Sequence, residues 1–345
     1  MKGLFFKLFS LMVVAMMALT ACGSPATATP AAPAATQPAA APAATATVAA
    51  PTAQPLSGTI NISGAFALYP MMTVWAAEFT KLNPGVQFNV QAGGAGKGMT
   101  DALAGAVDIG MVSRAIQPAE EAKGAYWVSV AKDAVFPVIS AQNPVLADLM
   151  AKGISPAMFK KIFITGEVTT WGEVVGKPDD TDAIHLYTRS DSAGAADEWA
   201  LFCGGKVQAD ILKTAIGVNG EPALVATVIK DPLGITYSNL NSVFDVTSGN
   251  IVTGAAVPPI DVNGTGQITP DEVYKTTADA VNAVSSGKYP SPPARFENLV
   301  TKGKPTGVVQ AFIVWILTDG QKDLGQAGYV ALTPDQQAAA LAKAK

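Results

Sequence analysis

A strand–loop–helix unit occurs three times in this chain, and it constrains the fold more than any other feature. Residues 59–63, 88–92 and 183–188 are short β-rich runs, and each leads into a run whose apolar residues have helical spacing. In the first unit, Pro70 stands at the favoured first turn of the helix. This alternation of strands with helices predicts an α/β fold.

The loops of these units predict an anion site. The glycine-rich loop 93–98 precedes an expected helix at 99–103 and a further strand at 107–113, and the third strand runs into a helix at about Ser192. A helix N-terminus presents unpaired backbone N–H groups and the positive end of the helix dipole. Three such ends at the carboxyl ends of strands therefore favour binding of an anion through backbone amides.

Two charged side chains in the third loop refine this prediction. Arg189 offers a planar cationic fork that fits a tetrahedral oxyanion. Asp191 offers an acceptor that only a protonated oxyanion such as hydrogen phosphate satisfies, because a carboxylate repels a fully ionised anion. The alternative is a surface ion pair beside a helix that Asp191 or Ser192 caps.

The N-terminus predicts a lipid anchor. Residues 1–7 carry two lysines, an apolar run follows, and small residues lead up to Cys22. The stretch from Leu8 to Cys22 has 15 residues, fewer than the ~20 that cross a bilayer. We therefore expect a lipoprotein signal peptide at 1–21, lipidation of Cys22, and a place outside the cytoplasm, in the periplasm or at the cell surface.

The segment after the anchor has the composition of a tether. Residues 24–55 contain 15 Ala, 7 Pro and 6 Thr and carry no charge. Such a segment cannot build a core, and its prolines favour an extended chain. We expect residues 22–56 to hold a folded domain, residues 57–345, away from a membrane.

Charge and rare residues exclude several classes of protein. Lys plus Arg number 23 against 27 Asp plus Glu, for a net charge of -4, so we expect no nucleic-acid partner. One histidine and two cysteines are too few for a zinc site or a disulfide framework. Cys203 ends an apolar helical run and is expected to be a buried thiol. His185 lies in a strand, where we expect a buried core histidine.

The third loop resembles a motif of a known family. It reads Tyr187-Thr-Arg-Ser-Asp-Ser-Ala-Gly-Ala-Ala-Asp-Glu-Trp199, similar to the Arg-x-Asp-x-Ser-Gly-Thr loop of the PstS-like phosphate-binding lipoproteins that feed ABC importers. The resemblance covers most of 57–345, through segments 64–70, 93–98, 107–114, 132–138, 234–237, 287–295 and 312–321. It implies a two-lobed, type II-like periplasmic-binding-protein fold that closes on its ligand about a hinge. Lobe one would comprise 57–135 and 236–345, and lobe two 136–235.

The resemblance also implies where the ligand lies, namely between the lobes. The residues it assigns to the site are Ala65, Phe66, Ala95, Gly96, Ser113, Arg114, Arg189, Asp191, Ser192, Ala193, Gly194 and Ala195. Arg114 would add a second cation where some relatives place an acid, and the alternative is a charge on the lobe surface.

This chain departs from the family at the hydroxyl groups of the site. Relatives that bind phosphate offer serine or threonine in all three loops, whereas alanine stands here at 65, 67, 95, 193 and 195. Each lost hydrogen bond to a charged ligand is worth about 1.5–3 kcal/mol. Either phosphate is bound weakly, or another anion is the ligand.

A second motif is independent of these loops. Residues 261–272 fit a twelve-residue calcium loop, with oxygen ligands at alternate positions, glycine at the sharp turn and a terminal glutamate. The expected Ca²⁺ ligands are Asp261, Asn263, Thr265, the carbonyl of Gln267, and Glu272. With only two charged ligands we expect low affinity. The alternative is a Gly/Asn-rich turn, and in either case a helix is expected at 272–284.

Three functions remain open. The first is a solute-binding lipoprotein that captures phosphate or a related oxyanion for the membrane subunits of an ABC importer. The second is a surface sensor or adhesion module that kept the fold but lost ligand binding. The third, a secreted hydrolase, is disfavoured because the chain has no Gly-x-Ser-x-Gly elbow, and we expect no enzyme activity.

Overall fold

The computed structural model describes residues 55–325 and 327–345. The predicted signal peptide, Cys22 and all but the last two residues of the tether lie outside this range. Residues Ala53–Lys345 group into one compact unit. In the part of the chain that is described, no helix is both long enough and apolar enough to cross a membrane.

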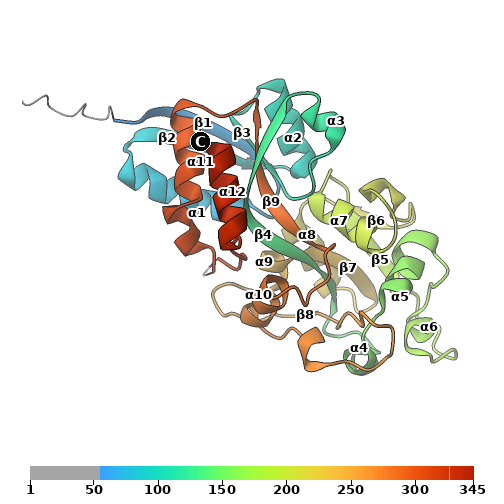
Figure 1. The fold of residues 1–345 in the computed structure, drawn as a ribbon. Coiled ribbons are helices and arrows are strands. Elements are labelled where there is room, and N and C mark those ends of the chain that lie inside the picture. Colours follow the sequence, from blue (N-terminus) through green and yellow to red (C-terminus); the bar gives the residue numbers. More distant parts are fainter. Residues whose placement is uncertain (1–54, 326) are drawn as a thin grey trace, which may run out of the picture. The chain divides into compact units, whose positions relative to one another are not determined.

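The strands of this unit follow one another in the order β2-β1-β3-β9-β4-β7-β5-β6, with β8 beside β4 (Figure 1). Their bounds are Ser57–Gly64 (β1), Gly85–Ala92 (β2), Ile109–Val112 (β3), Ala125–Ser140 (β4), His185–Arg189 (β5), Ile216–Val218 (β6), Gly234–Asn239 (β7), Ala255–Ala256 (β8) and Ala294–Lys302 (β9). Strands β2, β1 and β3 are parallel, as are β7, β5 and β6, while β9 and β4 are antiparallel to their neighbours.

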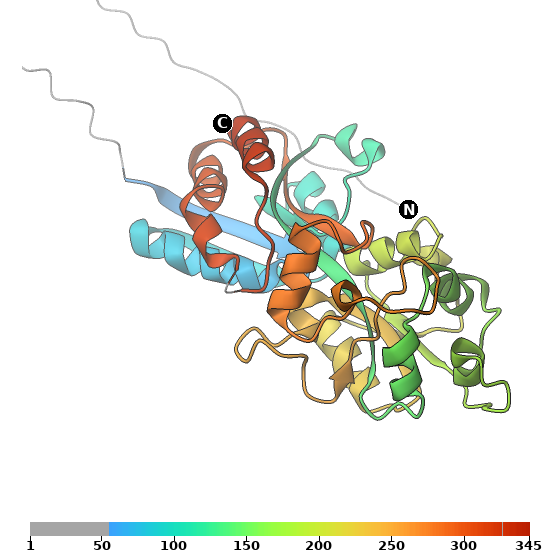
Figure 2. The ribbon, with the colours of Figure 1, turned by 60° about the horizontal axis from the view of Figure 1, so that its bottom comes forward.

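The α-helices alternate with these strands, as the sequence predicts. They are Tyr69–Leu82 (α1), Ala95–Ala104 (α2), Pro118–Glu121 (α3), Leu146–Lys152 (α4), Pro156–Lys160 (α5), Trp171–Val175 (α6), Gly194–Phe202 (α7), Glu221–Ile229 (α8), Leu240–Val243 (α9), Thr277–Ser285 (α10), Gly307–Ile316 (α11) and Pro334–Ala344 (α12). Near the C-terminus, α11 and α12 lie side by side (Figure 2).

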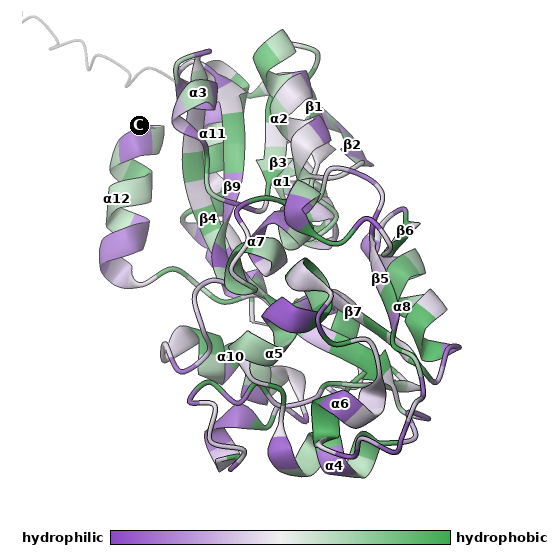
Figure 3. Ribbon diagram, turned by 90° about the vertical axis from the view of Figure 1, so that its right-hand side faces the viewer, coloured by the Kyte–Doolittle hydropathy of each residue, from purple (hydrophilic) through white to green (hydrophobic). Residues whose placement is uncertain are grey.

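Strand β4 connects two hydrophobic cores. Its first part, through Ala134, pairs with β9, and residues from Val135 onward pair with β7. The strand is mostly hydrophobic along its length (Figure 3). The two lobes of the predicted periplasmic-binding-protein fold are thus joined by a strand that belongs to both, which confirms the fold class.

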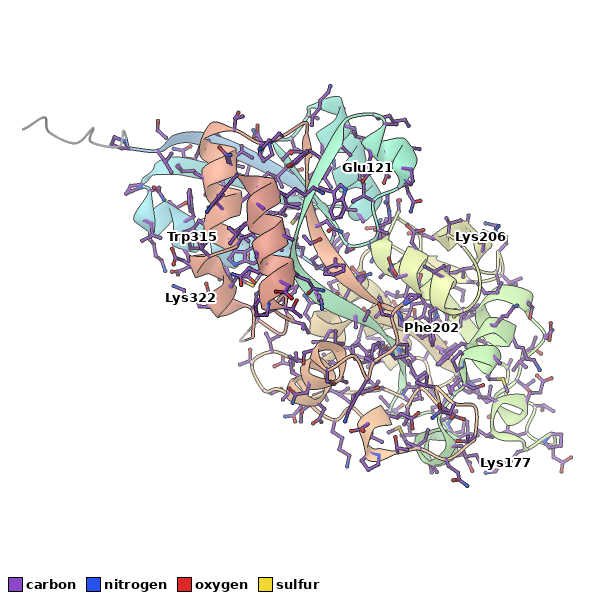
Figure 4. All side chains as sticks on the ribbon, viewed as in Figure 1. Glu121, Lys177, Phe202, Lys206, Trp315 and Lys322 are labelled. Carbon is purple, nitrogen blue, oxygen red and sulfur yellow. The ribbon has the colours of Figure 1, made fainter. Side chains whose placement is uncertain are left out.

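The first core lies between α1, the strands β1 and β3, and the C-terminal helices. Trp75 is fully buried there and donates its indole N–H to the carbonyl of Gly320 over 2.8 Å. Phe79 packs against Trp315 with ring centroids 5.5 Å apart. Figure 4 labels Trp315. These contacts explain the helical spacing of large apolar residues after Pro70.

The second core gathers around Phe136, Trp199 and Tyr237, all fully buried. The Trp199 ring stacks on Tyr237 with centroids 5.7 Å apart and packs against Phe202 with centroids 5.2 Å apart. Figure 4 labels Phe202. The core continues through the chain to Tyr289, whose ring lies 4.4 Å from Phe136. The prediction that lobe one resumes at residue 236 is therefore wrong for the segment up to Tyr289. Strand β7 inserts between β4 and β5, which keeps that segment in lobe two.

Two predicted helix starts also need correction. Helix α2 begins at Ala95 rather than at 99, because Gly94 supplies the N-cap with a positive φ of 91°. Most of the expected loop 93–98 is therefore helical. Helix α10 begins at Thr277 rather than at 272, because Thr276 caps it by accepting the Asp279 N–H.

Candidate functional site

The three predicted loops meet at the junction of the lobes. The Gly96 N–H, in the first turn of α2, donates to the carbonyl of Ser192 over 3.1 Å. Gly194, at the start of α7, lies so close to Ser113 that an added Cβ would stand 2.4 Å from the Ser113 carbonyl oxygen. The Phe66 ring centroid lies 5.1 Å from Cζ of Arg189. Residues far apart in sequence are thus brought together as predicted.

Arg189 is the centre of this arrangement. It ends β5, and its side chain is only 1% exposed. Its Nε donates to Oδ1 of Asp191 over 2.7 Å, and its Nη2 donates to Oδ2 of the same carboxylate. Asp191 Oδ1 also accepts the Gly220 N–H over 3.1 Å. Arg189 and Asp191 therefore form a buried bidentate ion pair, and not the surface ion pair of the alternative interpretation.

Glu221 belongs to the candidate site, although the sequence did not predict it. Its Oε1 forms an ion pair with Nη1 of Arg189, and its side chain is 3% exposed. It is the first residue of α8, directly after Gly220, so β6 and α8 form a fourth strand–loop–helix unit. An acidic residue in the first turn of a helix that follows a short strand was the available signal.

Burial shifts the pKa values of the charged groups at the site. Burial raises the pKa of Glu221, and the nearby Arg189 and Arg295 guanidinium groups lower it only in part. Burial works to lower the pKa of Arg189, but Glu221 and Asp191 overcome this and raise it. One guanidinium thus faces two carboxylates, which leaves the group with an excess of negative charge when all are ionised.

The alanines that replace family hydroxyls are buried at the site. Ala65, Ala95, Ala193 and Ala195 are each 1% exposed. Any hydrogen bonds to a ligand there come from the backbone. The Ala193 N–H, predicted to face the ligand, instead donates to Oε1 of Gln208 over 3.0 Å.

Arg114 connects the lobes. Its guanidinium donates to both carboxylate oxygens of Glu120, over 2.9 and 2.7 Å, and its Nε lies 3.3 Å from Oδ2 of Asp197 in α7. Its cationic head is therefore engaged by two carboxylates, one of them on the other lobe. Ser113, its neighbour, is 3% exposed and lies against Gly194.

A surface pocket of about 540 Å³ lies beside the third loop, lined among others by Asp191, Ser192 and Gln208. All of its lining residues belong to the second lobe. It therefore borders the loop from one side and is not the space between the lobes.

The structure leaves His185 exposed and buries Cys203. The expectation of a buried core histidine is wrong, because the His185 side chain is 46% exposed and its Nδ1 lies 2.8 Å from Oδ2 of Asp231. His185 is the first residue of β5, at the rim of the sheet. Cys203 is buried as expected, and burial raises the pKa of its thiol.

In the predicted calcium loop, the first and last carboxylates accept hydrogen bonds from the loop itself. Asp261 accepts the N–H groups of Thr265 and Gly266, over 3.1 and 2.7 Å. Glu272 accepts the Val262 N–H over 3.2 Å and also the N–H and hydroxyl of Thr269. Among the described residues, no group of three or more His, Cys, Asp or Glu could hold a metal. The donors here are two carboxylates with neutral oxygens, and calcium binding stays a prediction.

Comparison with known proteins identifies the family. Residues 49–320 match the PBP superfamily domain. The chain belongs to the PBP superfamily. The phosphate-binding protein PstS of Bacillus subtilis (strain 168) is 30% identical over 283 residues, which cover 80% of this chain and 82% of that protein. The PstS of Methanocaldococcus jannaschii is 25% identical, with coverage of 80% and 84%. The chain is therefore PstS-like, and its family is of the solute-binding type.

Solved structures support the same fold. A substrate-binding protein assigned to a phosphate ABC transporter of Clostridium perfringens, solved with phosphate bound, aligns with a TM-score of 0.63 and 22% identity, over 80% of this chain and all of that one. A phosphate transport receptor from Vibrio cholerae aligns with a TM-score of 0.58 and 18% identity, over 79% and 100%. At these identities the likeness concerns the fold alone.

Proposed function

We propose that this PstS-like protein captures phosphate, or a closely related oxyanion, outside the cytoplasm and delivers it to an ABC importer. The observation that carries the proposal is the buried Arg189–Asp191 pair at the meeting point of three strand-end loops and both lobes. Arg189 supplies the fixed positive charge, and the N-termini of α2 and α7 face the same junction. The names of the PstS relatives support phosphate as the first ligand to test.

Backbone amides replace the missing hydroxyls in this proposal. The buried alanines at 65, 95 and 195 leave room for the chain itself to approach an anion. Asp191 accepts the proton of a protonated oxyanion and disfavours a fully ionised one. The expected selectivity is therefore for protonated forms of phosphate and arsenate over sulfate.

Anchoring and partners extend the proposal. The predicted lipidation of Cys22 and the uncharged tether would keep the domain near the importer's membrane subunits. Calcium at 261–272 would stabilise the second lobe without touching the ligand. We expect no enzyme activity, since Arg189, Asp191 and the backbone amides of the described site bind and position an anion.

A sensor or adhesion module is the second candidate, and one observation favours it. Arg189 already forms ion pairs with Asp191 and Glu221, so its positive charge is neutralised without a ligand. A protein that no longer binds an anion could keep such an arrangement.

The test is titration of the purified soluble domain with phosphate, arsenate, sulfate and small organic anions by calorimetry. Arg189→Ala is expected to weaken binding by roughly 2–5 kcal/mol, because it removes a charge from a buried site. Arg189→Lys serves as the matched control that keeps the charge but loses the two-point geometry. If no anion binds the wild-type protein or any variant, the transport proposal fails and the sensor candidate takes its place.

A further inference from the structure

Glu221 contacts Arg189 with a carboxylate oxygen, at the group expected to bind the anion. Asp191 occupies one edge of the guanidinium through Nε and Nη2, and Glu221 occupies Nη1. A carboxylate is itself a planar oxyanion, so it satisfies an arginine in the way that a phosphate oxygen does. In this structure all three guanidinium nitrogens of the arginine expected to bind the ligand contact a carboxylate of its own chain, while Nη1 and Nη2 each keep a second N–H.

Only one carboxylate oxygen of Glu221 has a partner in this arrangement. Its second oxygen, Oε2, is buried and has no hydrogen-bond partner among the described residues. An ionised buried oxygen without a partner is costly. Glu221 is therefore a poor permanent partner for Arg189, although the Arg189–Asp191 contact is bidentate.

The surroundings of Glu221 are rich in charge. The titratable groups that face it are Arg189, Asp191, Tyr237, Asp133, Arg295 and Glu297. Three of these are carboxyl groups and two are arginines, so they add no net positive charge to hold an extra anion. Burial raises the pKa of Glu221, Arg189 and Arg295 lower it in part, and Asp191 and Asp133 raise it further. A protonated Glu221 no longer forms an ion pair with Nη1 of Arg189.

We propose that Glu221 is a built-in competitor of the oxyanion ligand, which binds only when Glu221 leaves Nη1 of Arg189 or takes up a proton. The inference rests on the proposed function, because it concerns the same Arg189 site. It assigns Glu221 a role in selectivity, since an anion must exchange with a carboxylate in a site that already has excess negative charge. A monoanion is then favoured over a dianion, and binding is coupled to pH.

Glu221→Gln tests the competition directly. Glutamine keeps the size of the side chain but removes its charge, so we expect phosphate to bind about 10- to 100-fold more tightly than in the wild-type domain. The matched control is Glu198→Gln, which removes another buried carboxylate of the second lobe that makes no ion pair with Arg189. The control is expected to leave phosphate affinity within about threefold of the wild-type value.

The pH dependence separates competition from a general effect of charge. The ratio of the phosphate dissociation constants of wild type and Glu221→Gln cancels the titration of phosphate itself. We expect this ratio to be large at alkaline pH and to fall toward one as the pH drops through the pKa of Glu221. Glu221→Asp, which withdraws the carboxylate by one methylene, should give an intermediate affinity and serves if the glutamine variant does not fold.

The outcomes are distinct. If wild type and a folded Glu221 variant bind phosphate equally, or the variant binds more weakly, the competition is refuted while the proposed function stands. A ratio that does not change with pH overturns the proton coupling. If only the variants bind an anion, the competition is supported in its strongest form. If neither binds any anion, the proposed function fails and this inference fails with it.

Discussion

Arg295 is the residue whose removal should most clearly reveal how the junction of the lobes is held together. It lies in β9, and its Nη2 donates to Oδ2 of Asp133 in β4 over 3.0 Å and to Oδ1 of Asn239 in β7. Its Nε lies 3.5 Å from Oε1 of Glu297. The side chains of Arg295, Asp133 and Glu297 are 2%, 1% and 0% exposed.

Arg295→Met would leave two buried carboxyl groups without their cation. Removal of one partner from such a pair costs about 3–5 kcal/mol, a large part of the ~5–15 kcal/mol that stabilises a typical domain. Urea denaturation followed by tryptophan fluorescence measures the loss. Lys302→Met is the matched control, because Lys302 is an exposed cation at the end of the same strand, and we expect a change within about 0.5 kcal/mol.

The pH dependence of this loss has a definite sign. Burial raises the pKa of Asp133 and of Glu297 above their ordinary values. A carboxyl group with a raised folded-state pKa contributes stability below its unfolded pKa, and this contribution is lost as the pH rises through the folded pKa. Without Arg295 both pKa values rise further, so the deficit of the variant should shrink in mild acid and grow in mild alkali. Equal stability of variant and wild type, or a deficit that grows in acid, would refute the reasoning.

Three further predictions concern other parts of the chain. Cys22→Ser should release the protein into the soluble fraction, and recovery with the membrane would contradict lipidation. Calcium should raise the melting temperature of the wild-type domain but not of Glu272→Ala, by the linkage of ligand to folding; no shift at millimolar calcium would remove that claim. Gly194→Ala should hold the lobes apart, since its Cβ would stand 2.4 Å from the Ser113 carbonyl oxygen, whereas Gly325→Ala meets nothing within 4 Å; small-angle scattering would show an unchanged radius of gyration if this is wrong.

The sequence predicted Arg189 and Asp191 because their signal is local. They stand two residues apart at the end of a β-rich run and before a helix, and this spacing alone places both at one strand end. The same local logic located β1, α1 and β3. Local patterns succeed here because strand period and helix period are properties of a single segment.

Local patterns do not predict contacts between segments that are distant in the sequence. Glu221 reaches Arg189 from a helix that begins 32 positions later, and nothing in its own segment indicates which guanidinium it meets. The lobe boundary failed for the same reason, since β7 could pair either with β4 or with the first sheet. His185 was misplaced because a strand pattern does not show that the residue is the first of its strand, at the rim.

The charge balance of the junction bears on which form of an anion it can accept. When Asp191 and Glu221 are both ionised, they and Arg189 together carry a net charge of -1. A bound dianion would make this net charge -3. Coulomb repulsion at such distances is strong in a buried site. A monoanion that arrives as Glu221 is neutralised leaves Arg189 facing two negative charges, the same number as without ligand. The acidic neighbours of the arginine therefore do not argue against an anion site; they argue for one that exchanges a carboxylate for a singly charged oxyanion.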